Sequence, residues 1–215
     1  DRRVGCHATD AIIDQRLRVP ANLAPREASF SPDGSRIAYV AQHLGAAQIF
    51  VLALADPVGR PVTGGDLSPT HPTWSPDGRR IAFVGAVPAA PAKIEGVPEK
   101  SKGAERAPEP KIISDLFWRS DAGGEQKPAA FHLFTVSDAG GEPVALTKGE
   151  ADAVDPSGLA WTPDGRFLIA SLSPDPVRRP AESDLYRFDS GRPGQPPVRL
   201  TSRAGSEEGP VVSPD

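Results

Sequence analysis

The sequence is poor in cysteine, methionine and aromatic residues. Its 215 residues include one Cys, no Met, and only 6% Phe, Trp and Tyr. The lone Cys6 excludes an intrachain disulfide and a zinc site built from paired cysteines. Small disulfide-stapled folds and Cys-rich metal-binding folds are therefore excluded.

Long apolar runs and an excess of basic charge are also missing. No apolar stretch reaches the roughly 18 residues that a transmembrane helix needs. The chain carries 24 Lys and Arg against 28 Asp and Glu, a net charge of -4, whereas nucleic-acid-binding proteins display clustered basic residues. We therefore predict neither a nucleic-acid nor a membrane partner. The absence of an H-E-x-x-H motif and of a Gly-rich phosphate loop predicts no metal and no cofactor.

Proline and glycine, by contrast, are abundant, at 25 and 21 residues. Frequent turn residues with short segments between them favour β-strands over long helices. One sequence motif recurs three times: "FSPDGSRIAYV" at 30–40, "WSPDGRRIAFV" at 74–84 and "WTPDGRFLIAS" at 161–171.

The spacing of the motif aspartates gives the period of the repeat. Asp33 and Asp77 are 44 residues apart, and Asp164 follows after 87 residues, close to twice that period. This spacing predicts a degenerate copy at Asp121, in "LFWRSDAGG". A further copy, "VVSPD", begins before Asp215. A period near 44 residues is the length of a four-stranded propeller blade.

Each repeat is interpreted as four antiparallel strands. An incoming strand ends at the aromatic residue, the "SPDG" turn follows, and the outgoing strand is apolar on both faces, as in sheets packed between other sheets. Third strands are expected at 48–54, 132–136 and 184–188, and edge strands ending at Thr63, Thr147 and Thr201. The predicted fold class is all-β, a β-propeller of four-stranded antiparallel blades.

The repeated aspartates are interpreted as turn residues. Asp tolerates the third position of the turn, so Asp33, Asp77 and Asp164 are explained without a metal, although a cation-ligand role is the alternative. Residues 86–110 contain five prolines and no periodic apolar face. They are expected to form a mobile loop insertion, or else a loop that contacts a partner domain.

Residues 110–150 carry a resemblance to a known family. "SPDG" followed by "RIAYV" resembles both TolB-like propellers and the N-terminal propeller of prolyl oligopeptidase family serine peptidases. The matching residues resemble the acylaminoacyl-peptidase branch, in which "YRxDG" leads into "HLFxVxxxGGEPxxLTxG". These are Phe117-Trp118-Arg119, Asp121, His132-Leu133-Phe134, Gly140-Gly141-Glu142-Pro143 and Leu146-Thr147, with "DAGG" in place of the family's "DGxG".

The resemblance implies an α/β-hydrolase domain C-terminal to the propeller, and that domain is absent from this sequence. Its G-x-S-x-G nucleophile motif is not found, and the most similar pentapeptide, "GSEEG" at 205–209, has Glu207 at the nucleophile position. Without a nucleophile motif, no triad is expected from His7, His43, His71 or His132. We therefore predict no catalytic residue in this chain, and expect the chain to be an incomplete propeller fragment.

By resemblance, the function is that of a substrate-gating propeller in a serine peptidase that hydrolyses short peptides. The expected partners are the hydrolase domain of the same protein and short peptide substrates, and homo-oligomer formation stays open. The parent protein would be the enzyme, in the cytoplasm. The alternative is a stand-alone TolB-like propeller that binds a protein or ligand, in the periplasm.

Overall fold

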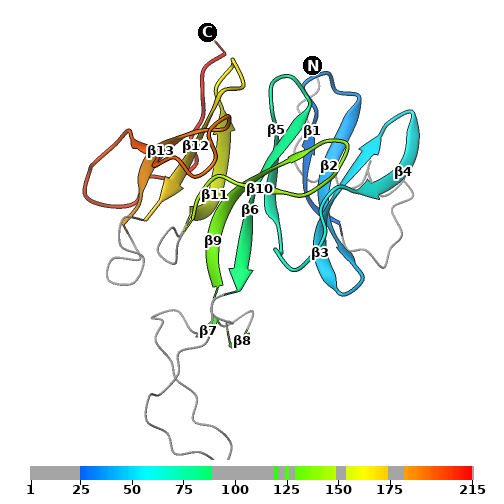
Figure 1. Ribbon diagram of the computed structural model, residues 1–215, viewed down its shortest axis with the longest axis horizontal. Helices are drawn as coiled ribbons and strands as arrows, with labels where there is room; N and C mark the ends of the chain where they lie inside the picture. Colours follow the sequence, from blue (N-terminus) through cyan, green and yellow to red (C-terminus); the bar gives the residue numbers. More distant parts are fainter. Residues whose placement is uncertain are drawn as a thin grey trace, which may run out of the picture. The chain divides into compact units, whose positions relative to one another are not determined.

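The computed structural model describes residues 25–88, 119–120, 124–125, 129–148, 154–173 and 182–214. Every helix or strand within these ranges is a β-strand, which confirms the predicted all-β class (Figure 1). No helix in this part of the chain is long and apolar enough to cross a membrane.

Twelve of the strands form three four-stranded antiparallel sheets. The first sheet contains β1 (Arg26–Phe30), β2 (Arg36–His43), β3 (Ala46–Ala53) and β4 (Asp56–Pro61). The second has the order β10-β9-β6-β5 and contains β5 (Thr70–Trp74), β6 (Arg80–Pro88), β9 (Ala129–Ser137) and β10 (Val144–Ala145). The third contains β11 (Val154–Trp161), β12 (Phe167–Leu172), β13 (Asp184–Asp189) and β14 (Val198–Arg199).

The sheet order concerns the stretch in which a repeat at Asp121 is predicted. Asp121 itself lies outside the described residues, as does Asp215. However, β9 pairs with β6, so the described chain between Asp77 and Asp164 contributes one four-stranded sheet and not two. The 87-residue step is thus one blade with an insertion between its second and third strands. The two-residue strands β7 (Arg119–Ser120) and β8 (Gly124–Glu125) pair within a separate unit, residues 88–129.

The predicted loop insertion at 86–110 is described only in part. Residues 86–88 are the end of β6, and residues 89–110 lie outside the described ranges. The three four-stranded sheets belong to the other unit, so the following paragraphs concern that unit alone.

The middle strands are buried on both faces, as their sequence predicts. In β6, Ile81 and Phe83 belong to the apolar cluster shared with the first sheet. Their neighbours Ala82 and Val84 belong to the cluster shared with the third sheet. All four side chains are at most 1% exposed. Because successive side chains of a strand point to opposite faces, one continuous apolar run supplies two cores.

The threonines that were expected to end the edge strands lie just beyond them. Each hydroxyl accepts a hydrogen bond from the backbone N–H of the neighbouring third strand. The bonds are Ile49 to Thr63 at 2.9 Å, Leu133 to Thr147 at 3.0 Å and Leu185 to Thr201 at 2.9 Å. The threonine thus continues the backbone pairing where the short edge strand has already ended.

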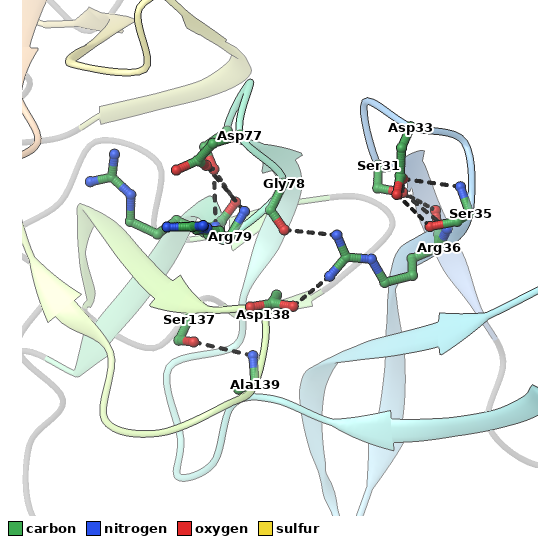
Figure 2. A network of polar contacts seen from close by, with 12 residues as sticks. Ser31, Asp33, Ser35, Arg36, Asp77, Gly78, Arg79, Ser137, Asp138 and Ala139 are labelled. Atoms are coloured by element: carbon green, nitrogen blue, oxygen red, sulfur yellow. Dashed lines mark hydrogen bonds and ion pairs between the residues drawn. The ribbon is translucent and has the colours of Figure 1, made fainter.

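An arginine three residues after the motif aspartate links each of the first two sheets to the next one. Arg36 donates from Nη2 to the Gly78 carbonyl at 2.9 Å and from Nη1 to Asp138, and its guanidinium lies 4.8 Å from the ring centroid of Trp74 (Figure 2). The arginine therefore holds two turns of the following sheet and covers its aromatic residue. We call this arrangement the arginine clasp.

The second sheet repeats the arginine clasp toward the third. Arg80 donates to the Gly165 carbonyl at 2.8 Å and to Ser190 Oγ at 3.1 Å, and lies 5.0 Å from the ring centroid of Trp161. The indoles of Trp74 and Trp161 also form hydrogen bonds with the preceding sheet. Trp74 Nε1 donates to the Ser29 carbonyl at 3.0 Å, and Trp161 Nε1 donates to the Thr73 carbonyl at 3.1 Å.

The third sheet departs from this pattern. Phe167 stands at the position of Arg36 and Arg80, and the guanidinium groups of Arg166 and Arg187 lie over its ring. The next copy of the motif also departs, because Val212 occupies the position of the tryptophans. Both halves of the arginine clasp are thus replaced together.

We expect the Arg80→Met substitution to destabilise the fold by about 2–3 kcal/mol. It removes two charge-assisted hydrogen bonds and a cation–π contact while keeping an unbranched side chain of similar length. Arg79→Met is the matched control, because Arg79 is the exposed neighbouring residue and the change in charge is identical. Urea unfolding of both variants measures the difference, and equal losses would contradict the role given to the clasp.

Candidate functional site

The motif turns are closed by their own aspartates. Asp33 Oδ1 accepts a hydrogen bond from Ser31 Oγ at 2.6 Å and one from the Ser35 N–H at 3.1 Å (Figure 2). Ser31 Oγ in turn accepts from the Arg36 N–H at 2.9 Å. The short side chains thus satisfy the backbone of a turn that lacks strand partners.

The other two turns repeat this geometry. Asp77 Oδ1 accepts from Ser75 Oγ at 2.5 Å and from the Arg79 N–H at 3.1 Å. Asp164 Oδ1 accepts from Thr162 Oγ1 at 2.5 Å and from the Arg166 N–H at 3.0 Å.

These hydrogen bonds stabilise the ionised carboxylates. The hydroxyl of the residue two positions earlier is the main cause that lowers the pKa of Asp33, Asp77 and Asp164 below the usual 3.8, followed by hydrogen bonds from the residue two positions later. The turn interpretation of the three aspartates therefore has a complete geometric explanation. Within the described ranges, no three His, Cys, Asp or Glu side chains come together as a metal site.

A second polar group lies on the inner strands, the first strand of each sheet. Each of these strands is interrupted by a shift in register, between Arg26 and Ser29 in β1 and between Thr70 and Thr73 in β5. Glu27 and His71 lie in these bulges with φ angles of 54° and 55°. Left-handed backbone is unusual for residues with a Cβ atom, and here it occurs at equivalent positions of two sheets.

Glu27 and His71 contact each other between the first and second sheets. Glu27 Oε2 accepts a hydrogen bond from the His71 backbone N–H at 2.6 Å, and His71 Nδ1 lies 3.9 Å from the same oxygen. Arg26 Nε lies 4.0 Å from Glu27 Oε1. The side chains are partly open, with 28% of Glu27 and 40% of His71 exposed. We call these two residues the inner-strand pair.

Glycine occupies the equivalent positions farther along the chain. Gly158 in the third sheet has φ 150°, and Gly209 in the next copy has φ 61°. A Cβ atom built on Gly158 would lie 3.6 Å from the Gly209 Cα atom, so these two positions are also adjacent. A register shift also interrupts β11, between Val154 and Leu159, whereas Gly209 lies outside the described strands. Of these four positions, only the first two carry a side chain.

The four histidines have separate surroundings. His7 lies outside the described residues, and His43 lies at the end of β2 with its ring 5.6 Å from that of Phe50. His132 is 6% exposed, and its Nδ1 is hydrogen-bonded to Thr147 Oγ1 at 2.9 Å. His132 is therefore a buried partner of the edge-strand threonine. His71 lies within β5.

The sequence interpretation missed Glu27 altogether. The signal was available, because Glu27, His71, Gly158 and Gly209 each stand three residues before the aromatic or valine residue of their motif. Two glycines at one repeat position indicate a left-handed backbone there. The two residues with side chains at that position then require a separate explanation. As for "GSEEG", the backbone N–H of Glu207 donates to Ser183 Oγ at 3.1 Å, a contact that links the segment to the third sheet.

Comparison with known proteins identifies the fold. No family model and no curated protein match the chain. A TolB structure from Agrobacterium tumefaciens matches with a TM-score of 0.51 and 21% identity, over 87% of this chain and 50% of that one. An acylaminoacyl peptidase from Pyrococcus horikoshii matches with a TM-score of 0.52 and 18% identity, over 83% of this chain and 25% of that one.

A puromycin-hydrolysing peptidase from Mycobacterium tuberculosis matches with a TM-score of 0.53 and 17% identity, over 86% of this chain and 23% of that one. The chain thus spans about half of the TolB structure and about a quarter of the peptidases. The three four-stranded sheets have the fold of propeller blades in TolB-like and peptidase structures.

We expect the motif aspartates to make stability depend on pH. Their folded-state pKa values are lowered, so the stability they contribute is present above the unfolded value of 3.8 and is lost as pH falls toward the folded values. Changing Asp33, Asp77 and Asp164 to Asn keeps an acceptor oxygen but removes the titration. The variant should lose less stability than the parent between about pH 5 and about pH 2 in urea unfolding. A control with Asp56, Asp66 and Glu142 changed to the amides alters three exposed carboxylates, and an equal effect there would contradict the assignment.

We expect the His71→Gly variant to be more stable than His71→Ala by about 1 kcal/mol, because only a residue with a Cβ atom is strained at this φ. Both variants keep the N–H that donates to Glu27. His43 in β2, which is not among the positive-φ residues, is the control. There, Gly should be less stable than Ala by roughly 0.5–1 kcal/mol in the same unfolding experiment. If the Gly variant were less stable than the Ala variant at residue 71 as well as at residue 43, the backbone strain at His71 would be negligible.

Proposed function

We propose that this chain is the substrate-gating propeller part of a serine peptidase that hydrolyses short peptides, of the acylaminoacyl-peptidase or prolyl oligopeptidase type. The proposal is supported by the blade fold together with the resemblance of residues 110–150. Residues 129–148 of that stretch supply β9, the following turn and β10 of the second sheet. In the turn, Gly140 and Gly141 have φ angles of 89° and 127°.

This turn is held by the first sheet. Arg60 donates to the Asp138 carbonyl at 2.7 Å and to the Ala139 carbonyl at 3.0 Å, while Arg36 forms an ion pair with the Asp138 carboxylate. The motif residues from His132 to Thr147 are thus parts of a packed blade, whereas Phe117, Trp118 and Asp121 lie outside the described residues. They support a propeller of this type, while the chemistry of acyl transfer belongs to the proposed hydrolase domain.

Gating follows from how closely the inner strands approach one another. Trp74 of the second sheet donates to the inner strand of the first at 3.0 Å, and Trp161 of the third sheet donates to the inner strand of the second at 3.1 Å. Successive inner strands are therefore in direct contact. Blades packed around an axis leave a channel lined by these strands. In the proposed enzyme such a channel passes an extended peptide and excludes a folded protein.

The insertion in the second sheet is the proposed contact with the hydrolase domain. β6 begins directly after the motif turn and ends at Pro88, and β9, the next strand of the sheet along the chain, begins at Ala129. In our proposal the loop within 86–110 or the hairpin within 119–130 faces the hydrolase and contributes to size selection.

The test uses the complete polypeptide that contains this chain. A fluorophosphonate probe should label one serine, and acylated peptides of about three to six residues should be hydrolysed faster than peptides of about thirty residues, as in a gated site. Replacing residues 89–128 by a short turn should raise the cleavage of the long peptides relative to the short ones. If the probe labelled no serine, the peptidase part of the proposal would be contradicted. If a folded, active variant without residues 89–128 kept the same length selectivity, the role of these residues in size selection would be contradicted.

A TolB-like binding propeller is the second candidate. It is favoured by the match to the Agrobacterium TolB structure, which covers 87% of this chain. An exported precursor that no serine-directed probe labels would support this alternative, since it requires no hydrolase domain.

A further inference from the structure

We propose that the inner-strand pair selects peptides by charge, with the Glu27 carboxylate favouring a basic side chain or a free amino group on the passing peptide. This inference rests on the proposed function, because it names the substrate class of the proposed channel. It concerns two residues that lie on adjacent inner strands and meet between the first two sheets.

The first argument is backbone strain. Glu27 and His71 adopt φ angles of 54° and 55°, and the equivalent position in the next copy, Gly209, has φ 61°. Glycine adopts this left-handed backbone without a steric cost. Gly158 in the third sheet has φ 150°, a different backbone that also favours glycine. Strained residues of this kind concentrate at functional sites because their side chains are needed there.

The second argument is that core packing does not explain these side chains. The side chain of Glu27 is 28% exposed and that of His71 is 40% exposed, so neither is enclosed in the core. A carboxylate and an imidazole retained at strained, partly open positions are available to a ligand. The side chains therefore need a role outside the core.

The third argument is the orientation of the carboxylate. Glu27 Oε2 is occupied by the His71 backbone N–H at 2.6 Å, which fixes one oxygen. The other oxygen, Oε1, has Arg26 Nε at 4.0 Å, the outer limit of an ion pair, and Arg26 is 51% exposed. A ligand ammonium group can therefore approach Oε1, while a ligand carboxylate meets like charge.

His71 acts in this proposal as a positioning residue. Its backbone N–H holds Oε2, and its Nδ1, which is buried without a hydrogen-bond partner, lies 3.9 Å from that oxygen. Imidazole and backbone together restrict the Glu27 side chain from turning away. The equivalent positions Gly158 and Gly209 carry no side chain, so among these four copies Glu27 and His71 alone supply a titratable side chain at this repeat position.

The test measures peptide binding, which does not depend on hydrolysis. Fluorescein-labelled acetylated hexapeptides that differ only in a central Lys, Gln or Glu are titrated against the complete polypeptide after fluorophosphonate treatment. Fluorescence anisotropy should show the Lys peptide binding about fivefold more tightly than the Glu peptide, and about 0.5 M salt should reduce this ratio. Glu27→Gln should bring the ratio close to one, while the control Glu142→Gln, at an exposed turn residue, should leave it unchanged.

The His71 variants test the positioning role. His71→Gly should lower the Lys-to-Glu ratio because the carboxylate can then turn away, whereas His71→Asn, which tolerates a left-handed backbone, should keep it. Circular dichroism verifies that each variant is folded.

The outcomes separate this inference from the proposed function. A Lys preference that Glu27→Gln abolishes supports the charge-selective pair even where the probe labels no serine, and the peptidase proposal alone then fails. Equal binding of the three peptides to the parent protein, or a preference that survives Glu27→Gln, overturns the inference even where hydrolysis and probe labelling are found.

Discussion

The packing of each of the first two sheets against the next one depends on the arginine clasp. A middle strand such as β6 is apolar on both faces, so its burial requires neighbours on both sides in a fixed register. Apolar contacts are not directional and do not fix that register by themselves. Arg80 does so, because its guanidinium reaches two turns of the following sheet and covers Trp161 at the same time.

The motif turn positions the clasp. Asp33 and Ser31 close the turn through side-chain hydrogen bonds, and the arginine is the first residue of the strand that leaves it. The carbonyl that the clasp uses in the next sheet, that of Gly78, belongs to the next motif turn. The repeated motif therefore supplies both sides of a contact between sheets, the arginine from one copy and the glycine carbonyl and tryptophan from the next. This explains why Arg, Asp, Gly and Trp recur together.

The sequence predicted the strands well and the division into blades only in part. Apolar runs and turn residues are local signals, so the sheets beginning at Arg26, Thr70 and Val154 follow from them. The position of Asp121 fits the 44-residue period by spacing alone. Strand pairing, however, depends on which segments meet in space, and β9 pairs with β6. Glu27 was missed because a left-handed bulge depends on its two neighbouring strands, and a single glutamate in a strand carries no such signal.

Departures from a repeat have two different physical meanings in this chain. Phe167 and Val212 replace an arginine and a tryptophan that contact each other between the earlier sheets, so both partners of that contact change together. Glu27 and His71 replace glycine at a backbone that favours glycine, so each change adds strain that the repeat does not require. A joint change of two contacting residues belongs to packing within the fold. The strained residues have no such counterpart, and the proposed ligand role of the inner-strand pair rests on that difference.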